Sequence, residues 1–429
     1  MNGSQASLSR LGESLQSVFS NRLTWIWIGV WLVTRALMVV QVGFWNDVNG
    51  VNLQDVNSYE SWSDYLAEGN MPTDEGWQYP PGAAFVMLLP RISGLPFGES
   101  FVGTMLLVDL VGLSLMALLA RRTGRNTGVW VWLLGMPLLQ MFPVLRFDLV
   151  PTVLAIAALV VIHRRPVWFG ALAGIGAAVK VWPIAVLFGE WDRRRLAIGA
   201  GTALGAIALT FIVSGLSFGD QTTFLDNQGV RGLQLESVAA SPWYLESAIT
   251  GEPVNAIPRN GSNEIGSPIA DDLAKLLKWL AIAILAAAAL WWLARERQIR
   301  KGRVDLTDAA VSRDFVFALV LLLTVTSRVL SVQFMIWMVG LSAVMLTAGT
   351  RRMARPAWIV IGAVVLSAGL YQAPANLVIR NAALLFAALD AAVAMVLLLR
   401  RPEGELADDA EANPHQGPQP HPPPLSERG

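Results

Sequence analysis

Cysteine is absent from the 429 residues, so the chain can form no disulfide bond, no thiolate metal site and no cysteine nucleophile. Histidine is scarce: two of the three, His415 and His421, stand near the C-terminus, which argues against a histidine-based metal site. Charged residues make up only 15% of the chain and balance to a formal net charge of zero, so the total charge attracts no nucleic acid. Together with the mean hydropathy of +0.48, the low charge content indicates a membrane protein.

The apolar residues make up 54% of the chain and are gathered into blocks of about membrane-spanning length. The blocks are residues 24–44, 82–97, 99–120, 129–145, 149–162, 167–179, 181–190, 196–214, 273–294, 314–327, 333–349, 356–372 and 377–399. They predict an all-α, polytopic integral membrane protein with about 11–13 membrane helices or segments, some too short to cross unaided. In this assignment 82–97 is interfacial or re-entrant and 167–190 is a broken hairpin, with no soluble domain and no internal repeat. Arg35, Asp109 and Asp390 lie inside blocks, where interhelical ion pairs are the simplest explanation for them.

Clusters of arginine follow alternate boundaries of these blocks. They are Arg121, Arg122 and Arg125; Arg164 and Arg165; Arg193 to Arg195; Arg295 to Arg303; Arg351, Arg352 and Arg355; and Arg400 and Arg401. Such clusters face the cytoplasm, so a multi-pass protein of the cell membrane is expected. Residues 1–22 are polar without an evident cleavable signal and are expected in the cytoplasm, followed by a membrane domain over 23–400. The proline-rich, acidic residues 401–429 are expected to form a disordered cytoplasmic tail.

The first connection, residues 45–81, is acidic and aromatic, whereas most other hydrophilic stretches are short and basic. Its charges exclude it from lipid, and the arginine clusters place it outside the cytoplasm. Within it, the segment SYESWSDYLAEG predicts a short amphipathic helix with Tyr59, Trp62, Tyr65 and Leu66 on one face. This aromatic face is expected on the bilayer interface, as are most of the seventeen tryptophans of the chain.

Asp55 is the first candidate for chemistry in this connection. A carboxylate held near a low-dielectric wall can accept a proton from a substrate hydroxyl. The alternative is that Asp55 only caps the amphipathic helix. Asp47 is the second candidate for the base. The alternative interpretation of Asp47 is a solvated acid without a catalytic role.

Three charged residues occur where a membrane protein tolerates charge poorly. Arg146 and Asp148 stand at a helix boundary, where they pair with each other, snorkel, or serve a site. Lys180 interrupts the 167–190 hairpin just before a helix-breaking proline. A buried cation beside unwound backbone suits a phosphate, and snorkelling to the interface is the alternative.

Other polar candidates lie on the same outer side. The segment RGLQLES contains Arg231, which could hold phosphate, and Gln234 and Glu236, which could bind hydroxyl groups, although ordinary loop polarity would also explain them. Tyr79 precedes two prolines in QYPP, a sequence that also suits the start of a helix. The segment SRVLSVQ ends at Gln333 and completes the set. Polar residues from distant parts of the sequence thus converge on one face, which is the pattern of a site.

These motifs, taken in order, resemble those of a known family. They are DV..Y, GN.P and YPP in the first connection, then RFD..P, AAxKxWP, RGLQLES and SVQFMIW. The set is similar to bacterial, especially actinobacterial, polyprenol-phosphate-sugar-dependent glycosyltransferases of the GT-C superfamily, in particular glycosyltransferase family 87 and its alpha-mannosyltransferase relatives. The resemblance covers about residues 24–400.

The resemblance implies a membrane glycosyltransferase without a cofactor, whose first outer loop supplies a catalytic Asp, here Asp55. It implies a polyprenyl-phosphate sugar donor, expected to carry mannose, and a glycolipid or glycan acceptor of the cell envelope. Tyr79, Lys180 and the segment 231–237 match the family's other elements. The first connection lacks the Asp-X-Asp of some relatives, which argues against a metal-dependent reaction. Direct displacement of the phosphate would invert the anomeric centre.

A lipid or solute transporter is the alternative, because transporters also combine many apolar blocks with broken helices. Transporters commonly have two halves of related hydropathy and polar groups near the midplane. Here the polar residues instead gather on one face beneath an acidic loop, which favours an enzyme. A non-catalytic scaffold would need none of the charged residues within the membrane.

Overall fold

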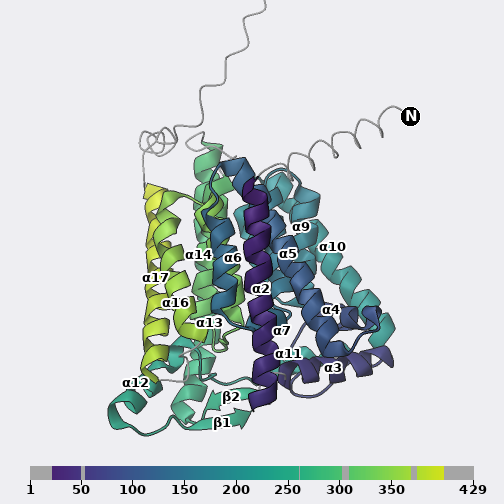
Figure 1. Ribbon diagram of the computed structural model, residues 1–429. Coiled ribbons are helices and arrows are strands. Elements are labelled where there is room, and N and C mark those ends of the chain that lie inside the picture. Colours follow the sequence, from purple (N-terminus) through teal and green to yellow (C-terminus); the bar gives the residue numbers. More distant parts are fainter. Residues whose placement is uncertain (1–21, 50–53, 260, 302–308, 369–373, 401–429) are drawn as a thin grey trace, which may run out of the picture.

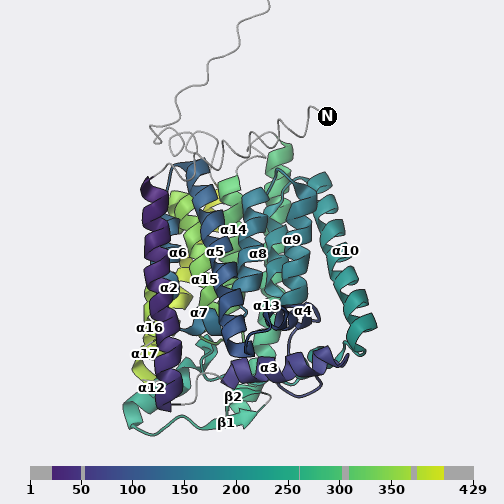
Figure 2. The ribbon, with the colours of Figure 1, turned by 45° about the vertical axis from the view of Figure 1, so that its right-hand side comes forward.

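The computed structural model describes residues 22–49, 54–259, 261–301, 309–368 and 374–400; the expected tail and residues 1–21 of the expected N-terminal segment lie outside these ranges. The described residues form a bundle of helices with short elements gathered at one end (Figures 1 and 2). This end is called the hairpin end, because the strands β1 (Ala256–Arg259) and β2 (Ser262–Ile265) lie there. The other end is called the arginine end, where Arg125 donates to the carbonyl oxygens of Leu346 and Gly349 at the C-terminal end of α15 (Phe334–Ala348).

Five of the described helices are long and apolar enough to cross a membrane. They are α2 (Arg22–Asn49), α5 (Phe97–Thr123), α10 (Arg193–Phe218), α13 (Pro268–Arg300) and α17 (Pro374–Arg400). Their 26 to 33 residues correspond to about 39–50 Å of helix. The chain is therefore an all-α polytopic membrane protein, as the apolar blocks predict.

A second set of apolar helices is shorter. It comprises α6 (Thr127–Leu138), α8 (Leu149–Val161), α9 (Pro166–Val179), α14 (Ala309–Val325), α15 (Phe334–Ala348) and α16 (Ala354–Ala368). The 13 to 15 residues of α8, α9 and α15 span only about 20–22 Å. Three candidate residues directly flank these helices: Asp148 precedes α8, Lys180 follows α9 and Gln333 precedes α15.

The predicted broken hairpin over 167–190 is confirmed. The helix α9 stops at Val179, Lys180 adopts extended backbone, and the 3-10 helix η2 (Trp182–Gly189) begins with a proline in its first turn. The hairpin begins and ends at the same depth in the bundle, because His163 before α9 contacts Glu190 after η2 at 2.9 Å. Before α5 begins at Phe97, the 82–97 block forms α4 (Gly82–Leu88) and the 3-10 helix η1 (Leu89–Ser93), too short to cross, as expected of an interfacial or re-entrant segment.

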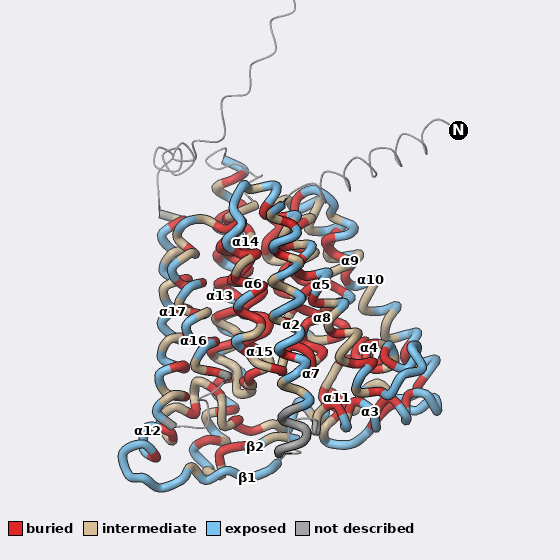
Figure 3. Tube along the Cα trace, viewed as in Figure 1, coloured by how far each residue is buried: buried red, intermediate tan, exposed pale blue. Residues whose placement is uncertain are grey.

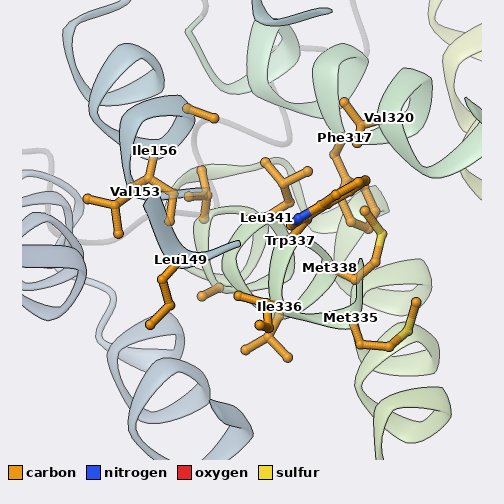
Figure 4. Close-up of a cluster of buried hydrophobic side chains, with 14 of the residues drawn as sticks. Leu149, Val153, Ile156, Phe317, Val320, Met335, Ile336, Trp337, Met338 and Leu341 are labelled. Carbon is orange, nitrogen blue, oxygen red and sulfur yellow. The ribbon is translucent and has the colours of Figure 1, made fainter. Parts of the chain in front are cut away.

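The core of the bundle is built around α15. Every residue from Met335 to Ala348 is buried, and the buried positions gather in the middle of the bundle (Figure 3). Figure 4 shows side chains of α15 meeting Leu149 and Ile156 of α8 and Phe317 of α14. At the periphery, α9 and α10 approach so closely that a Cβ on Gly170 would lie 1.9 Å from the carbonyl oxygen of Gly199. Only glycine permits this contact, a common device for packing membrane helices.

The charged residues inside the apolar blocks form interhelical ion pairs, as predicted. Arg35 of α2 and Asp109 of α5 are each 2% exposed, with 2.8 Å between Arg35 Nε and Asp109 Oδ2. The Arg35 guanidinium also donates to the carbonyl oxygen of Leu133 at 2.7 Å, so the pair fixes α6 as well. Asp390 of α17 pairs with Arg355 of α16 at 3.5 Å. Each pair neutralises charge that lipid would not tolerate alone.

The hairpin end contains a small sheet that the sequence did not predict. The strands β1 and β2 pair antiparallel, with Ala256 opposite Ile265 and Arg259 opposite Ser262. Residues 233–235 lie against β2, because Ile265 N–H donates to Leu233 O at 2.9 Å and Leu235 N–H to Asn263 O at 3.1 Å. The short helices α11 (Thr223–Gly229) and α12 (Ser241–Thr250) complete this end. The segment RGLQLES is thereby held in a defined position.

The amphipathic helix is confirmed as α3 (Gln54–Ala67), but the expected contact of its aromatic face with the bilayer is wrong for most of that face. Tyr59 is 2% and Trp62 is 8% exposed, whereas Tyr65 is 54% exposed. Tyr59 packs against Phe101 and Phe147 with ring centroids 5.3 and 5.5 Å apart. Protein aromatic rings bury this face more completely than an interface would. The expectation that most tryptophans lie at interfaces also fails for the buried Trp27, Trp62, Trp77, Trp132, Trp191, Trp291 and Trp337.

Replacing Arg35 by leucine leaves the buried Asp109 carboxylate without its counter-charge. We expect the free energy of unfolding, measured by denaturation of the purified protein in detergent, to fall by about 3–5 kcal/mol. The control is Arg91→Leu, which breaks an exposed pair with Asp64 and should cost at most about 1 kcal/mol. If the free energy of unfolding fell equally in the two variants, the buried pair would stabilise the fold no more than the exposed pair does.

Candidate active site

A cavity of about 1890 Å³ opens at the hairpin end. It exceeds the roughly 300–1,000 Å³ of ordinary small-molecule pockets, so it has room for two substrates. Eight of the candidate residues line it: Asp55, Tyr79, Arg146, Lys180, Arg231, Gln234, Glu236 and Gln333. Asp148 is fully buried and lies behind the cavity wall. Asp47 lies at the end of α2, and its side chain is outside the described part of the structure.

Asp55 stands in the first turn of α3 and forms an ion pair with Arg146. The Asp55 side chain is 48% exposed, while that of Arg146 is 11% exposed. Arg146 lies in extended backbone between α7 (Phe142–Leu145) and α8, and its Nε donates to Gln333 Oε1 at 3.1 Å. The alternative that Arg146 pairs with Asp148 is therefore wrong. Whether or not it caps α3, the Asp55 carboxylate thus contacts another residue that lines the cavity.

Asp148 pairs instead with Lys180, across 2.6 Å between Asp148 Oδ1 and Lys180 Nζ. Trp337 Nε1 donates to the same carboxylate oxygen at 2.7 Å. The ammonium group lies 4.9 Å from the ring centroids of both Phe334 and Trp337. A cation between aromatic faces and a carboxylate has little need of water. Snorkelling is therefore wrong for Lys180, whose charge is neutralised where it lies.

Three arginines, Arg231, Arg259 and Arg328, line the cavity near the hairpin; together they are called the arginine wall. Arg231 donates to Gln78 Oε1, and Arg328 donates to the carbonyl oxygen of Gln228. Within the described ranges neither of these two arginines has an ion-pair partner, whereas Arg259 pairs with Glu264. Burial lowers the pKa of both Arg231 and Arg328, and the charge of Glu264 opposes the change. The wall thus offers positive charge for an anion.

Gln234 and Glu236 line the same cavity as the arginine wall and Arg146. Gln234 is 9% exposed, and its Nε2 donates to Ser331 Oγ at 2.7 Å. Burial raises the pKa of the Glu236 carboxyl, while the charge of Arg380 opposes that rise. Both side chains face the cavity from the ordered segment 233–237, so they are positioned more firmly than ordinary loop residues.

Tyr79 lies among aromatic rings at the cavity wall. Its ring centroid is 4.8 Å from that of Phe147 and 6.0 Å from that of Trp77, both edge-on. The two prolines after it do begin α4, with Pro81 as its N-cap, yet Tyr79 itself remains in the lining. Burial raises the pKa of Tyr79 from 10.0 to about 12, and the negative charge of Asp148 contributes to this rise. The hydroxyl group is therefore neutral in any physiological buffer.

Several lining or supporting residues were missed by the sequence analysis. Gln78 adjoins Tyr79 in QYPP and Arg328 lies inside SRVLSVQ, so both stood within motifs already identified. Trp337 ends SVQFMIW, but nothing in its sequence context indicated a hydrogen bond to Asp148. Glu264 belongs to no motif, and its position near the cavity is evident only from the β-hairpin that contains it. No group of three or more potential ligands for a metal ion gathers among the residues that the structure describes.

The raised pKa of Tyr79 predicts a pH dependence of stability. A neutral tyrosine that ionises less readily when folded contributes stability below pH 10.0, and this contribution is lost as the pH rises toward about 12. We expect roughly 2–3 kcal/mol to be lost across this window, measured by denaturant unfolding at a series of alkaline pH values. Tyr79→Phe should lose distinctly less over the same range. Identical pH profiles for the two proteins would show that Tyr79 ionises normally.

Comparison with known proteins finds one family. No curated protein and no solved structure matches the chain. The family model described as glycosyltransferase family 87 matches residues 77–312, which is more than half of the chain and includes Tyr79, Arg146, Lys180 and Arg231. The chain is therefore a membrane glycosyltransferase and belongs to glycosyltransferase family 87.

Proposed function

We propose that the protein transfers a sugar, expected to be mannose, from a polyprenyl-phosphate donor to a glycolipid or glycan acceptor of the cell envelope. The observation that carries this proposal is that Asp55 and the arginine wall line one cavity at one end of the bundle. A carboxylate can take the proton of an attacking hydroxyl, and guanidinium groups can stabilise a departing phosphate. The large cavity volume accommodates donor and acceptor together.

The orientation follows from the distribution of arginine. Arg122, Arg125, Arg193 and Arg313 lie at the arginine end, where they bind helix-terminal carbonyl groups or Glu296. Positive residues face the cytoplasm in multi-pass proteins of the cell membrane. The cavity then opens on the extracytoplasmic face, where lipid-linked sugars and envelope acceptors are accessible.

The reaction proposed is a single displacement at the anomeric carbon. The acceptor oxygen forms a bond to this carbon while the bond from the carbon to the phosphate oxygen breaks, and the electron pair leaves with polyprenyl phosphate. Asp55 accepts the proton of the acceptor hydroxyl. Attack opposite to the leaving group inverts the anomeric configuration. Because both substrates are held in one cavity, correct placement supplies much of the rate increase.

Arg146 must loosen its contact with Asp55 for this step, because a carboxylate paired with a guanidinium is a weak base. A donor phosphate near Arg146 provides an alternative anion for that guanidinium. Gln333 holds the Arg146 Nε and would keep the side chain in the cavity during the exchange. The pair thus allows Asp55 to become basic when the donor is bound.

The structure favours the arginine wall over Lys180 as the direct ligand of the phosphate. The charge of Lys180 is already balanced by Asp148, whereas Arg231 and Arg328 have no ion-pair partner among the described residues. Lys180 instead orients Asp148 and the aromatic rings around it. Gln234, Glu236, Tyr79 and Gln333 offer hydrogen bonds to the sugar hydroxyl groups from the same cavity.

The lipid tail of the donor is proposed to enter between α10 and α13. Residues 204–213 of α10 and 278–287 of α13 include no buried position, so the rest of the bundle covers the middle of each helix only partly. Figure 2 shows α10 at the edge of the molecule. Val181 lines the cavity and is 61% exposed, which extends an apolar surface outward.

The test is transfer of labelled sugar from polyprenyl-phosphate mannose by purified protein in lipid nanodiscs with an envelope glycolipid as acceptor. For Asp55→Asn we expect donor binding to persist and turnover to fall by about 10²–10⁴. The matched control is Asp64→Asn, which alters an acid on the same helix that pairs with Arg91 and does not line the cavity. Wild-type turnover in Asp55→Asn would remove Asp55 as base and favour Asp47.

A second prediction concerns the phosphate. Arg231→Gln keeps a polar group but removes positive charge where the phosphate is proposed to leave. We expect kcat/KM for the donor to fall by about 10²–10³, with Arg91→Gln as the control for loss of an arginine elsewhere. If donor kinetics of Arg231→Gln match those of the wild type, the phosphate lies in another part of the cavity.

A further inference from the structure

Glu264 is a buried carboxylate directly behind the arginine wall. It lies on β2, is 0% exposed and does not line the cavity. The hairpin places it beside the segment that carries Arg231, because Glu264 forms a bridge with Gln234. A carboxylate without contact with solvent requires strong partners. These partners are contributed by the segments that form the wall.

The contacts of Glu264 are specific. Its Oε1 accepts a hydrogen bond from Gly232 N–H at 2.9 Å, and its Oε2 lies 2.7 Å from Arg259 Nε. A Cβ at residue 232 would lie 2.6 Å from both Glu264 Oε2 and Arg259 Nη2, so the close approach depends on glycine. Arg259 also contacts Asp271 at 2.6 Å, but that pair is 40% exposed on both sides.

Glu264 also acts on the two arginines without ion-pair partners. Its negative charge is within electrostatic range of Arg231 and of Arg328. Gln234 N–H donates to Arg328 O at 2.9 Å, which joins the segment of Arg231 to the α14–α15 connection. One buried negative charge thus contacts Arg259 directly and the backbone next to Arg231, and it acts electrostatically on Arg231 and Arg328, while all three arginines line the cavity.

We propose that Glu264 is a positioning residue, a buried counter-ion that holds the arginine wall together and limits the strength with which the wall retains a phosphate. This inference rests on the proposed role of the wall in binding the donor phosphate. Without Glu264, three guanidinium groups would bind the product polyprenyl phosphate more tightly. Efficient turnover needs stronger binding in the transition state than in the product complex. A fixed counter-charge serves this purpose without contacting the substrate.

The test is the affinity of wild-type protein and of Glu264→Gln for polyprenyl phosphate, measured in lipid nanodiscs by titration at low and high salt. The glutamine oxygen can still accept from Gly232 N–H, and Arg259 keeps its contact with Asp271, while one negative charge is lost. We expect Glu264→Gln to bind polyprenyl phosphate roughly fivefold more tightly at low salt. The difference should shrink near 1 M salt, where the Debye length is about 3 Å.

A merely structural role predicts the opposite sign, because a disordered wall binds phosphate more weakly. Unchanged or weaker binding by folded Glu264→Gln, or a difference insensitive to salt, would overturn the proposal. The matched control is Asp271→Asn, which removes the exposed carboxylate on the same arginine and should leave the affinity within about twofold.

Arg259→Gln carries the test if Glu264→Gln yields no folded protein. In Arg259→Gln the negative charge of Glu264 no longer has its ion-pair partner and acts on Arg231 and Arg328 alone. We therefore expect the affinity for polyprenyl phosphate to fall clearly more than in Asp271→Asn. Equal effects of these two variants would also overturn the proposal. If wild-type protein transfers sugar and binds polyprenyl phosphate but Glu264→Gln binds no more tightly, only the role of Glu264 fails. If wild-type protein does neither, the proposed function fails with it.

Discussion

A charge inside an apolar bundle is costly unless an opposite charge accompanies it, and this constraint determines which distant segments of the chain meet. Arg35 and Asp109 join α2 to α5, and Asp148 and Lys180 join the start of α8 to the break after α9. The ion pair between Asp55 and Arg146 connects α3 to the segment between α7 and α8 in the same way. The first pair is enclosed on every side and stabilises the fold. The third opens onto a cavity, so the same requirement that assembles the helices also places a carboxylate beside cations where a substrate can reach them.

The cavity itself follows from unequal helix lengths. The helices α8, α9 and α15, labelled in Figure 2, are shorter than the spanning helices, and residues at the ends of α9 and α15 line the cavity together with residues of α3 and of the hairpin. A helix terminus exposes unpaired backbone groups and is the natural position for polar side chains. Asp148, Lys180 and Gln333 occupy such positions, which explains why residues far apart in sequence share one level of the bundle. The site therefore arises where spanning segments end within the protein.

Much of this arrangement could be predicted from the sequence, because lipid leaves few choices for an apolar block. The blocks, the break at Lys180 and the set of polar segments around the cavity follow from composition, proline and the positions of arginine. The pairing of charges could not be predicted in the same way. Arg146 and Asp148 are neighbours in sequence, but the extended backbone at Arg146 directs the two side chains to different partners, Asp55 and Lys180. Glu264 was missed because its role depends on a hairpin of two four-residue strands with no apolar pattern.

The same geometry separates a transferase from a transporter. A transporter needs a route by which polar groups reach each side of the membrane in turn. Here the cavity is bounded on its inner side by Trp337, and beyond it α15 is buried at every position to Ala348, packed against α8 and α14 (Figure 4). Opening a path through close-packed side chains would sacrifice the central core of the bundle. Sugar transfer needs no such path, because donor, acceptor and both products remain on one side. A closed core beneath a charged, open cavity is thus the arrangement that glycosyl transfer at a membrane surface requires.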